Sequence, residues 1–257
     1  MTEKLFYEDS HRTEFTAKVI SCEEAKDGYR VVLDQTVFFP EGGGQYADTG
    51  VLGTVNVTDV HEKDDVIYHY TTAPLEVGSI VTGKINWEER FEKMQQHTGE
   101  HIVSGITHRL FHLDNVGFHM GAQAVTVDFN GELSAEQMAQ MERLANQAIY
   151  ENLPVLAECP PKEKLAQIDY RSKKELTGEV RIVTVPGYDC CACCGLHTAH
   201  TGEVGAIKVL SVQRYKGGVR VTLQFGSRAI QDYDEKLKSV TAISVLLSAK
   251  PEEVVDA

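Results

Sequence analysis

The sequence lacks several features that assign chains to other classes of protein. No part of its 257 residues approaches the ~20 consecutive apolar residues that a helix needs to span a bilayer, so we expect no membrane partner. Residues Met1 to Leu5 lead into polar sequence, which is not the pattern of a signal peptide. There is no internal repeat and no low-complexity tract. A chain of this length can bury an ample core in one large or two smaller domains.

Cysteine is scarce and unevenly placed. The chain has 6 cysteines, and four of them fall between Cys190 and Cys194. Crowding of this kind favours metal binding or redox chemistry over a framework of disulfides. We therefore expect a reduced protein of the cytoplasm.

Positive charge is also scarce. The chain has 25 Lys and Arg residues against 38 Asp and Glu residues, and the net charge of -13 argues against a polyanionic partner for the chain as a whole. One group of cations has only Glu203 close to it in the sequence. Such a group can neutralise a few phosphates or can be the solvated face of a strand. Its members are Lys208, Arg214, Lys216, Arg220 and Arg228.

The residues before Asn86 predict short β-strands that are separated by Gly and Asp turns. Even spacing of short strands favours a small barrel or a sandwich. The expected strands are Glu14 to Ser21, Tyr29 to Leu33, Val51 to Val60, Val66 to Tyr70 and Ser79 to Ile85.

After Asn86 the patterns of helices and strands mix. Asn86 and Glu89 predict the start of a helix that runs past His101, and Ser134 opens a capping-box sequence. We expect two domains, residues 1–87 and residues 88–257, and a fold of the α+β class. The further expected elements are strands at Val180 to Val185, Ala206 to Val212 and Val219 to Phe225, and a last helix near Arg228.

Two short segments predict a metal site. His97 and His101 are four residues apart on the expected helix and share one of its faces. Cys193 and His197 have the same spacing about a hundred residues later. Three imidazoles and one thiolate form a ligand set that suits tetrahedral Zn²⁺. Four protein ligands are more usual in structural zinc sites, so a structural role stays open beside a catalytic one.

The first segment also fits a second motif. His97, Glu100 and His101 match the H-x-x-E-H pattern of zinc peptidases, in which the glutamate activates a zinc-bound water. That class completes its site with a carboxylate rather than with Cys-x3-His. Glu100 is therefore either a catalytic base or a charge that faces solvent.

A glycine-rich run spans Phe38 to Gly50. Its three consecutive glycines, Gly42 to Gly44, permit positive φ and a close approach of the backbone to a partner. The run lacks the Lys-Ser/Thr end of a P-loop and the spacing of a dinucleotide motif. It is either a tight turn between barrel strands or part of a binding site.

Taken together, these segments resemble a known family. His97 to His101 resembles the H-T-x-x-H element of the alanyl-tRNA synthetase editing domain, and Cys193 to Gly205 resembles its C-x-G-T-H…T-G-E-I-G element. Phe39 to Gly50 is similar to the glycine-rich motif of the free-standing AlaX-type editing proteins. The chain departs from these patterns at Leu196, where Thr is usual, at Tyr46, where Pro is common, and at Glu100, which is often Gln.

The resemblance implies a translation-factor-like β-barrel followed by an α+β editing domain. It implies hydrolysis of tRNA(Ala) that is mischarged chiefly with serine, with glycine as the second substrate, because a pocket shaped for alanine cannot strongly reject an analogue of similar size. No ATP is involved. The alternatives are a non-catalytic tRNA-binding module with structural zinc and a zinc peptidase. Because longer AlaX relatives continue with further segments, we expect the gene to extend past Ala257.

The resemblance also assigns residues. It implies that His97, His101, Cys193 and His197 hold Zn²⁺, and we expect His97, His101 and Glu100 to take part in catalysis. The segment Val116 to Gly121 would line the aminoacyl pocket. The expected substrate contacts are Gly117, Phe118, His119, Leu196 and Gln45, and the expected tRNA contacts are Lys208, Arg214, Lys216, Arg220 and Arg228.

Overall fold

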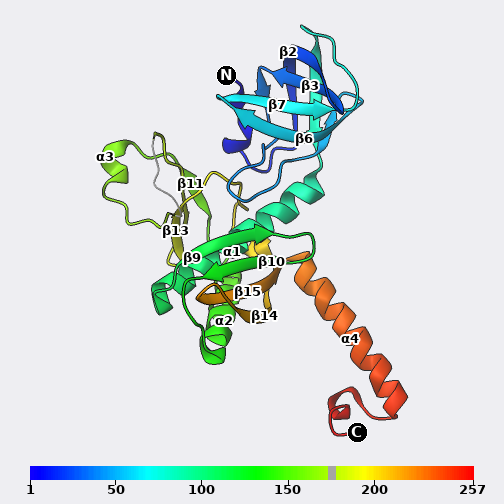
Figure 1. Cartoon of the computed structure of the whole chain (residues 1–257), viewed down its shortest axis with the longest axis vertical. Coiled ribbons are helices and arrows are strands. Elements are labelled where there is room, and N and C mark those ends of the chain that lie inside the picture. Colours follow the sequence, from blue (N-terminus) through cyan, green and yellow to red (C-terminus); the bar gives the residue numbers. More distant parts are fainter. Residues whose placement is uncertain (173–177) are drawn as a thin grey trace.

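The computed structural model describes residues 1–172 and 178–257, and its first part is a small β-barrel (Figure 1). Six strands close in the order β2-β3-β7-β6-β5-β8. The short strands β1 (Glu3–Lys4) and β4 (Gln35–Thr36) pair in parallel beside them. The barrel strands are β2 (Glu14–Ala25), β3 (Gly28–Leu33), β5 (Gly50–Leu52), β6 (Val55–Lys63), β7 (Val66–Thr71) and β8 (Ile80–Ile85).

One predicted strand in this part is wrong. The expected single strand from Val51 to Val60 is two strands, β5 and β6, which pair in antiparallel fashion. Gly53 lies between them with a φ of 62°, a left-handed conformation that glycine adopts without steric cost. The hydrophobic pattern continues through the turn, so periodicity alone did not reveal the reversal.

The barrel core contains a buried histidine, His69. Its Nδ1 lies 3.2 Å from the carbonyl oxygen of Val31, and its Nε2 lies 2.8 Å from Oγ1 of Thr36. A carbonyl can only accept, so Nδ1 carries the proton and Nε2 accepts from the threonine hydroxyl. Burial lowers the pKa of His69 to about 4, and the hydrogen bond to Val31 opposes the shift. The ring is therefore neutral in the folded barrel at neutral pH.

His69 makes the fold sensitive to acid. The pKa of His69 is about 4 in the folded chain and 6.5 when the side chain is exposed to solvent. The contribution of the neutral ring to folding stability is therefore complete above pH 6.5 and is lost as the pH falls towards 4. We expect His69→Gln to reduce the loss of stability between pH 7 and pH 5 by about 2 kcal/mol. Denaturant unfolding at the two pH values measures this loss of stability. His61→Gln is the control, because the His61 side chain is half-exposed. An equal pH dependence in His69→Gln and the wild type would contradict the assignment.

The second part of the chain packs two helices against an antiparallel sheet. The sheet has the strand order β14-β15-β10-β9. Its core joins α1, α2 and the sheet through Ile102, Ile106, Met141, Val127 and Phe225. The helices are α1 (Trp87–Phe111) and α2 (Ala135–Glu151), and the strands are β9 (Asn115–Met120), β10 (Val125–Phe129), β14 (Ile207–Tyr215) and β15 (Gly218–Phe225).

Both predicted helix starts are confirmed. The side chain of Asn86 accepts from the backbone amide of Glu89, and Ser134 forms a complete capping box with Gln137. These contacts satisfy amide groups that have no partner in the first turn of a helix. Strands β9 and β10 were not predicted as strands.

A second sheet and a projecting helix complete the structure. Figure 1 shows α4 extending away from the two sheets. In the described residues, no helix combines the length and the apolar character needed to cross a bilayer. The remaining elements are β11 (Leu156–Glu158), β12 (Ile182–Val185) and β13 (Asp189–Ala192), which form the second sheet, and η1 (Leu5–Tyr7), α3 (Lys162–Leu165), η2 (Thr201–Val204), α4 (Ser227–Leu247) and η3 (Pro251–Glu253).

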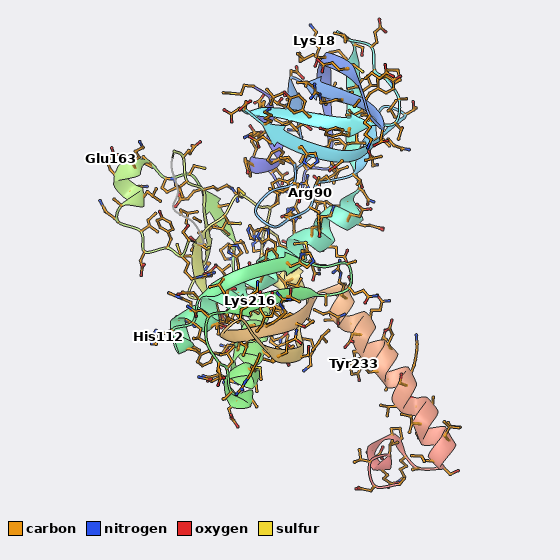
Figure 2. The ribbon with its side chains drawn as sticks, in the orientation of Figure 1. Lys18, Arg90, His112, Glu163, Lys216 and Tyr233 are labelled. Carbon is orange, nitrogen blue, oxygen red and sulfur yellow. The ribbon has the colours of Figure 1, made fainter. Side chains whose placement is uncertain are left out.

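A buried ion pair joins the barrel to α1. Arg90 lies in the first turns of α1 and binds both carboxylate oxygens of Asp48, and neither side chain is exposed. It also donates to the carbonyl oxygens of Ser10 and Val37. Figure 2 shows Arg90 where α1 meets the barrel. This pair fixes the glycine-rich run, which contains Asp48, relative to the helix.

Candidate metal centre

The middle of α1 presents two histidines to the interior. His97 and His101 are one turn apart, with ring centroids 5.3 Å from each other. Both are almost completely buried. The i, i+4 spacing of the sequence thus places two imidazoles on one face of the helix, as predicted.

The loop after β13 brings two further donors to this face. Cys193 directly follows strand β13. His197 lies four residues later, with its ring centroid 4.5 Å from the ring centroids of both His97 and His101. Sγ of Cys193 lies 3.4 Å from Nε2 of His97. The four ligand atoms all lie within 4.8 Å of one another. We call these four residues the donor group.

Two of the rings are held by an outer partner at their second nitrogen. Nδ1 of His97 lies 3.1 Å from Oε1 of Gln45, and Nδ1 of His197 lies 3.2 Å from Oγ1 of Thr98. Contacts of this kind leave Nε2 of each ring for a metal and fix the plane of the ring.

The third ring faces a carboxylate. Nδ1 of His101 lies 3.0 Å from Oδ2 of Asp189, and Arg171 holds the same carboxylate through contacts of 2.8 and 2.9 Å. The histidine contact is an ion-pair contact rather than an aligned hydrogen bond, because Nδ1 has no partner with hydrogen-bond geometry within residues 1–172 and 178–257. Asp189 and Arg171 were not predicted from the sequence. Asp189 precedes Cys193 by four residues, but nothing in the sequence links Arg171 to it.

The chemistry of the donor group fits a metal ion. Among the residues that the structure describes, Nε2 of His197 is buried without a partner in hydrogen-bond geometry, as expected for a nitrogen whose lone pair serves a cation. Burial alone raises the pKa of Cys193, but the three nearby histidines, His97 foremost, outweigh it. The pKa of Cys193 therefore lies well below its ordinary value. Three imidazoles with one thiolate suit Zn²⁺.

Glu100 is buried, so of its two interpretations the charge that faces solvent is wrong. Its Oε1 accepts from Oγ of Ser104 at 2.6 Å and from Nδ2 of Asn115. It is not a member of the donor group. These partners orient the carboxylate towards β9, which disfavours the peptidase interpretation of the H-x-x-E-H pattern.

The glycine-rich run lies against the donor group. An added Cβ at Gly43 would meet Sγ of Cys194 and the backbone of Gly195, and one at Gly44 would overlap the ring of Phe118. Both glycines have positive φ. The run is therefore more than a connection between barrel strands, because its backbone approaches the Cys193 loop more closely than side chains allow.

The expected substrate residues separate into different environments. The ring of Phe118 stacks on that of His97, with centroids 5.4 Å apart. Leu196 is fully buried in a cluster with Phe6, Phe39 and Met94. His119 is exposed, and Gly117 packs beside Asp128. Phe118 and Gln45 thus contact the donor group directly, and Leu196 supports its loop.

Four of the five expected tRNA contacts already have a carboxylate partner. Strands and helices that are distant in the sequence bring acidic residues to this group, so its charge is largely paired in the fold. Lys216 lies over the ring of Tyr215 at the hairpin turn, and Figure 2 shows it at the sheet. The pairs are Lys208–Glu142, Arg214–Glu132, Arg220–Asp128 and Arg228–Glu92.

A polar cavity of about 570 Å³ borders the residues that support the donor group. Its lining includes Asn115, Arg171 and Asp189, with Gly105 and Arg109 from α1. It therefore reaches the outer partners of His101 and Glu100 rather than the four donors themselves.

Comparison with known proteins agrees with this geometry. Residues 2–89 match the family model of class II (A) tRNA synthetases, and residues 180–222 match that of the threonyl and alanyl tRNA synthetase second additional domain. The second match covers the loop that carries Cys193 and His197.

Curated relatives match nearly the whole chain. An alanine–tRNA ligase of Natronomonas pharaonis is 36% identical over 98% of this chain and 29% of the ligase. The alanyl-tRNA editing protein AlaX-L of Pyrococcus horikoshii is 34% identical over 93% of this chain and 61% of that protein. The alanyl-tRNA editing protein Aarsd1 of Mus musculus is 31% identical over 97% of this chain and 65% of that protein. The chain spans less than a third of the ligase and less than two thirds of either editing protein. It carries the second additional domain of threonyl and alanyl tRNA synthetases, and over most of its length it is similar to the alanyl-tRNA editing proteins AlaX-L and Aarsd1.

Proposed function

We propose that this chain is a zinc-dependent hydrolase that removes serine, and secondarily glycine, from mischarged tRNA(Ala). The buried donor group of His97, His101, Cys193 and His197 carries the proposal, because it combines a metal-binding set with fixed outer partners. The names of the relatives, the alanyl-tRNA editing proteins AlaX-L and Aarsd1, support tRNA(Ala) as the nucleic-acid partner. We assign residues 1–87 to a translation-factor-like barrel domain and residues 88–257 to the editing domain.

The residues of the chain supply orientation and charge. When bound, Zn²⁺ would supply a Lewis acid at the ester. The thiolate of Cys193 offsets positive charge at the donor group, and the outer partners hold His97 and His197 with Nε2 inward. Glu100 is buried next to His101 on α1, where Ser104 and Asn115 donate to its Oε1 and fix the carboxylate, and we assign it the role of a proton acceptor.

One observation favours a second candidate function. Four protein donors form a closed set, which is more typical of structural zinc than of catalytic zinc. A non-catalytic tRNA-binding module with structural zinc is therefore the alternative. It predicts a folded protein that binds tRNA and releases no amino acid.

Deacylation assays decide between the two. We expect serine release from labelled Ser-tRNA(Ala) and slower glycine release from Gly-tRNA(Ala), without ATP, while Ala-tRNA(Ala) is spared. Removing the metal with a chelator should abolish the reaction, and added zinc should restore it. A zinc-loaded, folded protein that binds tRNA but releases no serine would establish the alternative.

A further inference from the structure

Gln45 connects the barrel segment to the donor group. It ends the three-glycine turn, forms a β-bridge with Gly42, and is completely buried. We infer that Gln45 is a positioning residue that fixes His97 in one tautomer and ties the Cys193 loop to α1. The glycine-rich run of the barrel is thereby part of the metal centre. The consequence for catalysis rests on the proposed function, whereas the positioning itself does not.

The orientation of the Gln45 amide follows from a backbone group. The amide nitrogen of Leu196 lies 3.0 Å from Oε1 of Gln45. A backbone N–H can only donate, so the atom that faces it must be the oxygen of the side chain. The opposite orientation would bring two donors together. The N–H donor that faces the amide therefore identifies which of its two terminal atoms is the oxygen.

The tautomer of His97 follows from that orientation. The same Oε1 lies 3.1 Å from Nδ1 of His97. An amide oxygen only accepts, so Nδ1 carries the proton and the lone pair of the neutral ring is on Nε2. That nitrogen lies 3.4 Å from Sγ of Cys193. In the other tautomer the Nδ1 lone pair would face Oε1, and Nε2 could no longer bind a metal.

One oxygen therefore holds both halves of the donor group. It accepts from a ring on α1 and from the backbone between Cys193 and His197. The approach is close, because a Cβ at Gly195 would overlap the ring of His97 and would lie 3.3 Å from Oε1 of Gln45. Gly195 is thus needed for this contact. Nε2 of Gln45 is buried and has no hydrogen-bond partner in the described part of the chain, so its oxygen is the atom that makes both contacts.

The test compares three variants of the full chain. Gln45→Met keeps the length of the side chain and removes the acceptor, whereas Gln45→Glu keeps acceptor oxygens. Gln96→Met is the matched control, because Gln96 is equally buried and adjacent to His97 but donates to the carbonyl oxygen of Phe225. Three quantities are measured. They are the zinc affinity by chelator competition, kcat and KM for Ser-tRNA(Ala), and the ¹⁵N shifts of His97 in the metal-free wild type.

The expected results separate positioning from a general structural role. Gln45→Met should weaken zinc binding on the order of 10- to 100-fold and lower kcat more than KM changes, as for other outer partners of metal ligands. Gln45→Glu should restore zinc binding to within a few-fold of the wild type, and Gln96→Met should bind zinc as the wild type does. The ¹⁵N shifts should show His97 protonated on Nδ1.

Two results would overturn the inference. One is wild-type zinc affinity in a folded Gln45→Met protein, and the other is the Nε2-protonated tautomer of His97. The NMR measurement uses unaltered protein, so it decides even where a variant fails to fold. Absence of deacylation in the wild type would refute the proposed function and leave the zinc and NMR results to judge Gln45.

Discussion

Cys193→Ala is expected to lower the rate of serine release from Ser-tRNA(Ala) by more than about 100-fold, since losing a ligand should exceed the loss of an outer partner. The thiol contributes the one anionic donor of the group, and its pKa lies well below the ordinary value. Its removal leaves three neutral imidazoles, which bind zinc less tightly. Single-turnover deacylation and metal content by elemental analysis measure the two effects.

A neighbouring cysteine gives the control for this experiment. Cys194 is exposed and is not a member of the donor group, so Cys194→Ala should retain both zinc and activity. Near-wild-type deacylation by Cys193→Ala would remove the thiolate from the mechanism. Unfolding of Cys193→Ala, together with an inactive wild type, would instead support structural zinc.

Arg90→Met is expected to lower the free energy of unfolding by about 3–5 kcal/mol. The substitution leaves the buried carboxylate of Asp48 without its cation. It also removes the donors to the carbonyl oxygens of Ser10 and Val37. Asp48 still accepts from the backbone amide of Phe39, but one hydrogen bond does not offset an uncompensated buried charge.

Denaturant unfolding of Arg90→Met and of a surface control tests this value. Lys84 pairs with Glu14 on the outside of the barrel, and both side chains are more than half exposed. Lys84→Met should therefore change the stability little, because solvent screens such pairs. Equal effects of the two substitutions would show that the buried pair does not hold the barrel and α1 together.

The donor group was predictable because its information is local. The spacing of His97 and His101 needs only a helix, and Cys193 with His197 repeats a known ligand spacing. The two helix caps at Asn86 and Ser134 are local for the same reason. Their residue types satisfy backbone amides within three positions.

The surroundings of the group were not predictable because they depend on distant contacts. Asp189 reaches His101 only when β13 packs beside α1, and the carboxylates that pair with Arg220 and Arg228 come from β10 and α1. Strand β9 was not predicted as a strand, since Gly117 interrupts its pattern. The role of Gln45 depends on a contact across the barrel junction, although its place in the glycine-rich run was a usable signal.

The separation of the two donor segments has a consequence for chain entropy. A metal held by His101 and Cys193 acts as a reversible cross-link that closes a loop of roughly 90 residues, for which a permanent link restricts the unfolded chain by about 4–5 kcal/mol. The ion would thus restrict the unfolded ensemble only while it is bound. The loop begins inside α1 and includes α2 and the sheet strands β9 to β13. Its closure would join α1 to the segment that follows β13, which no disulfide does among the described residues.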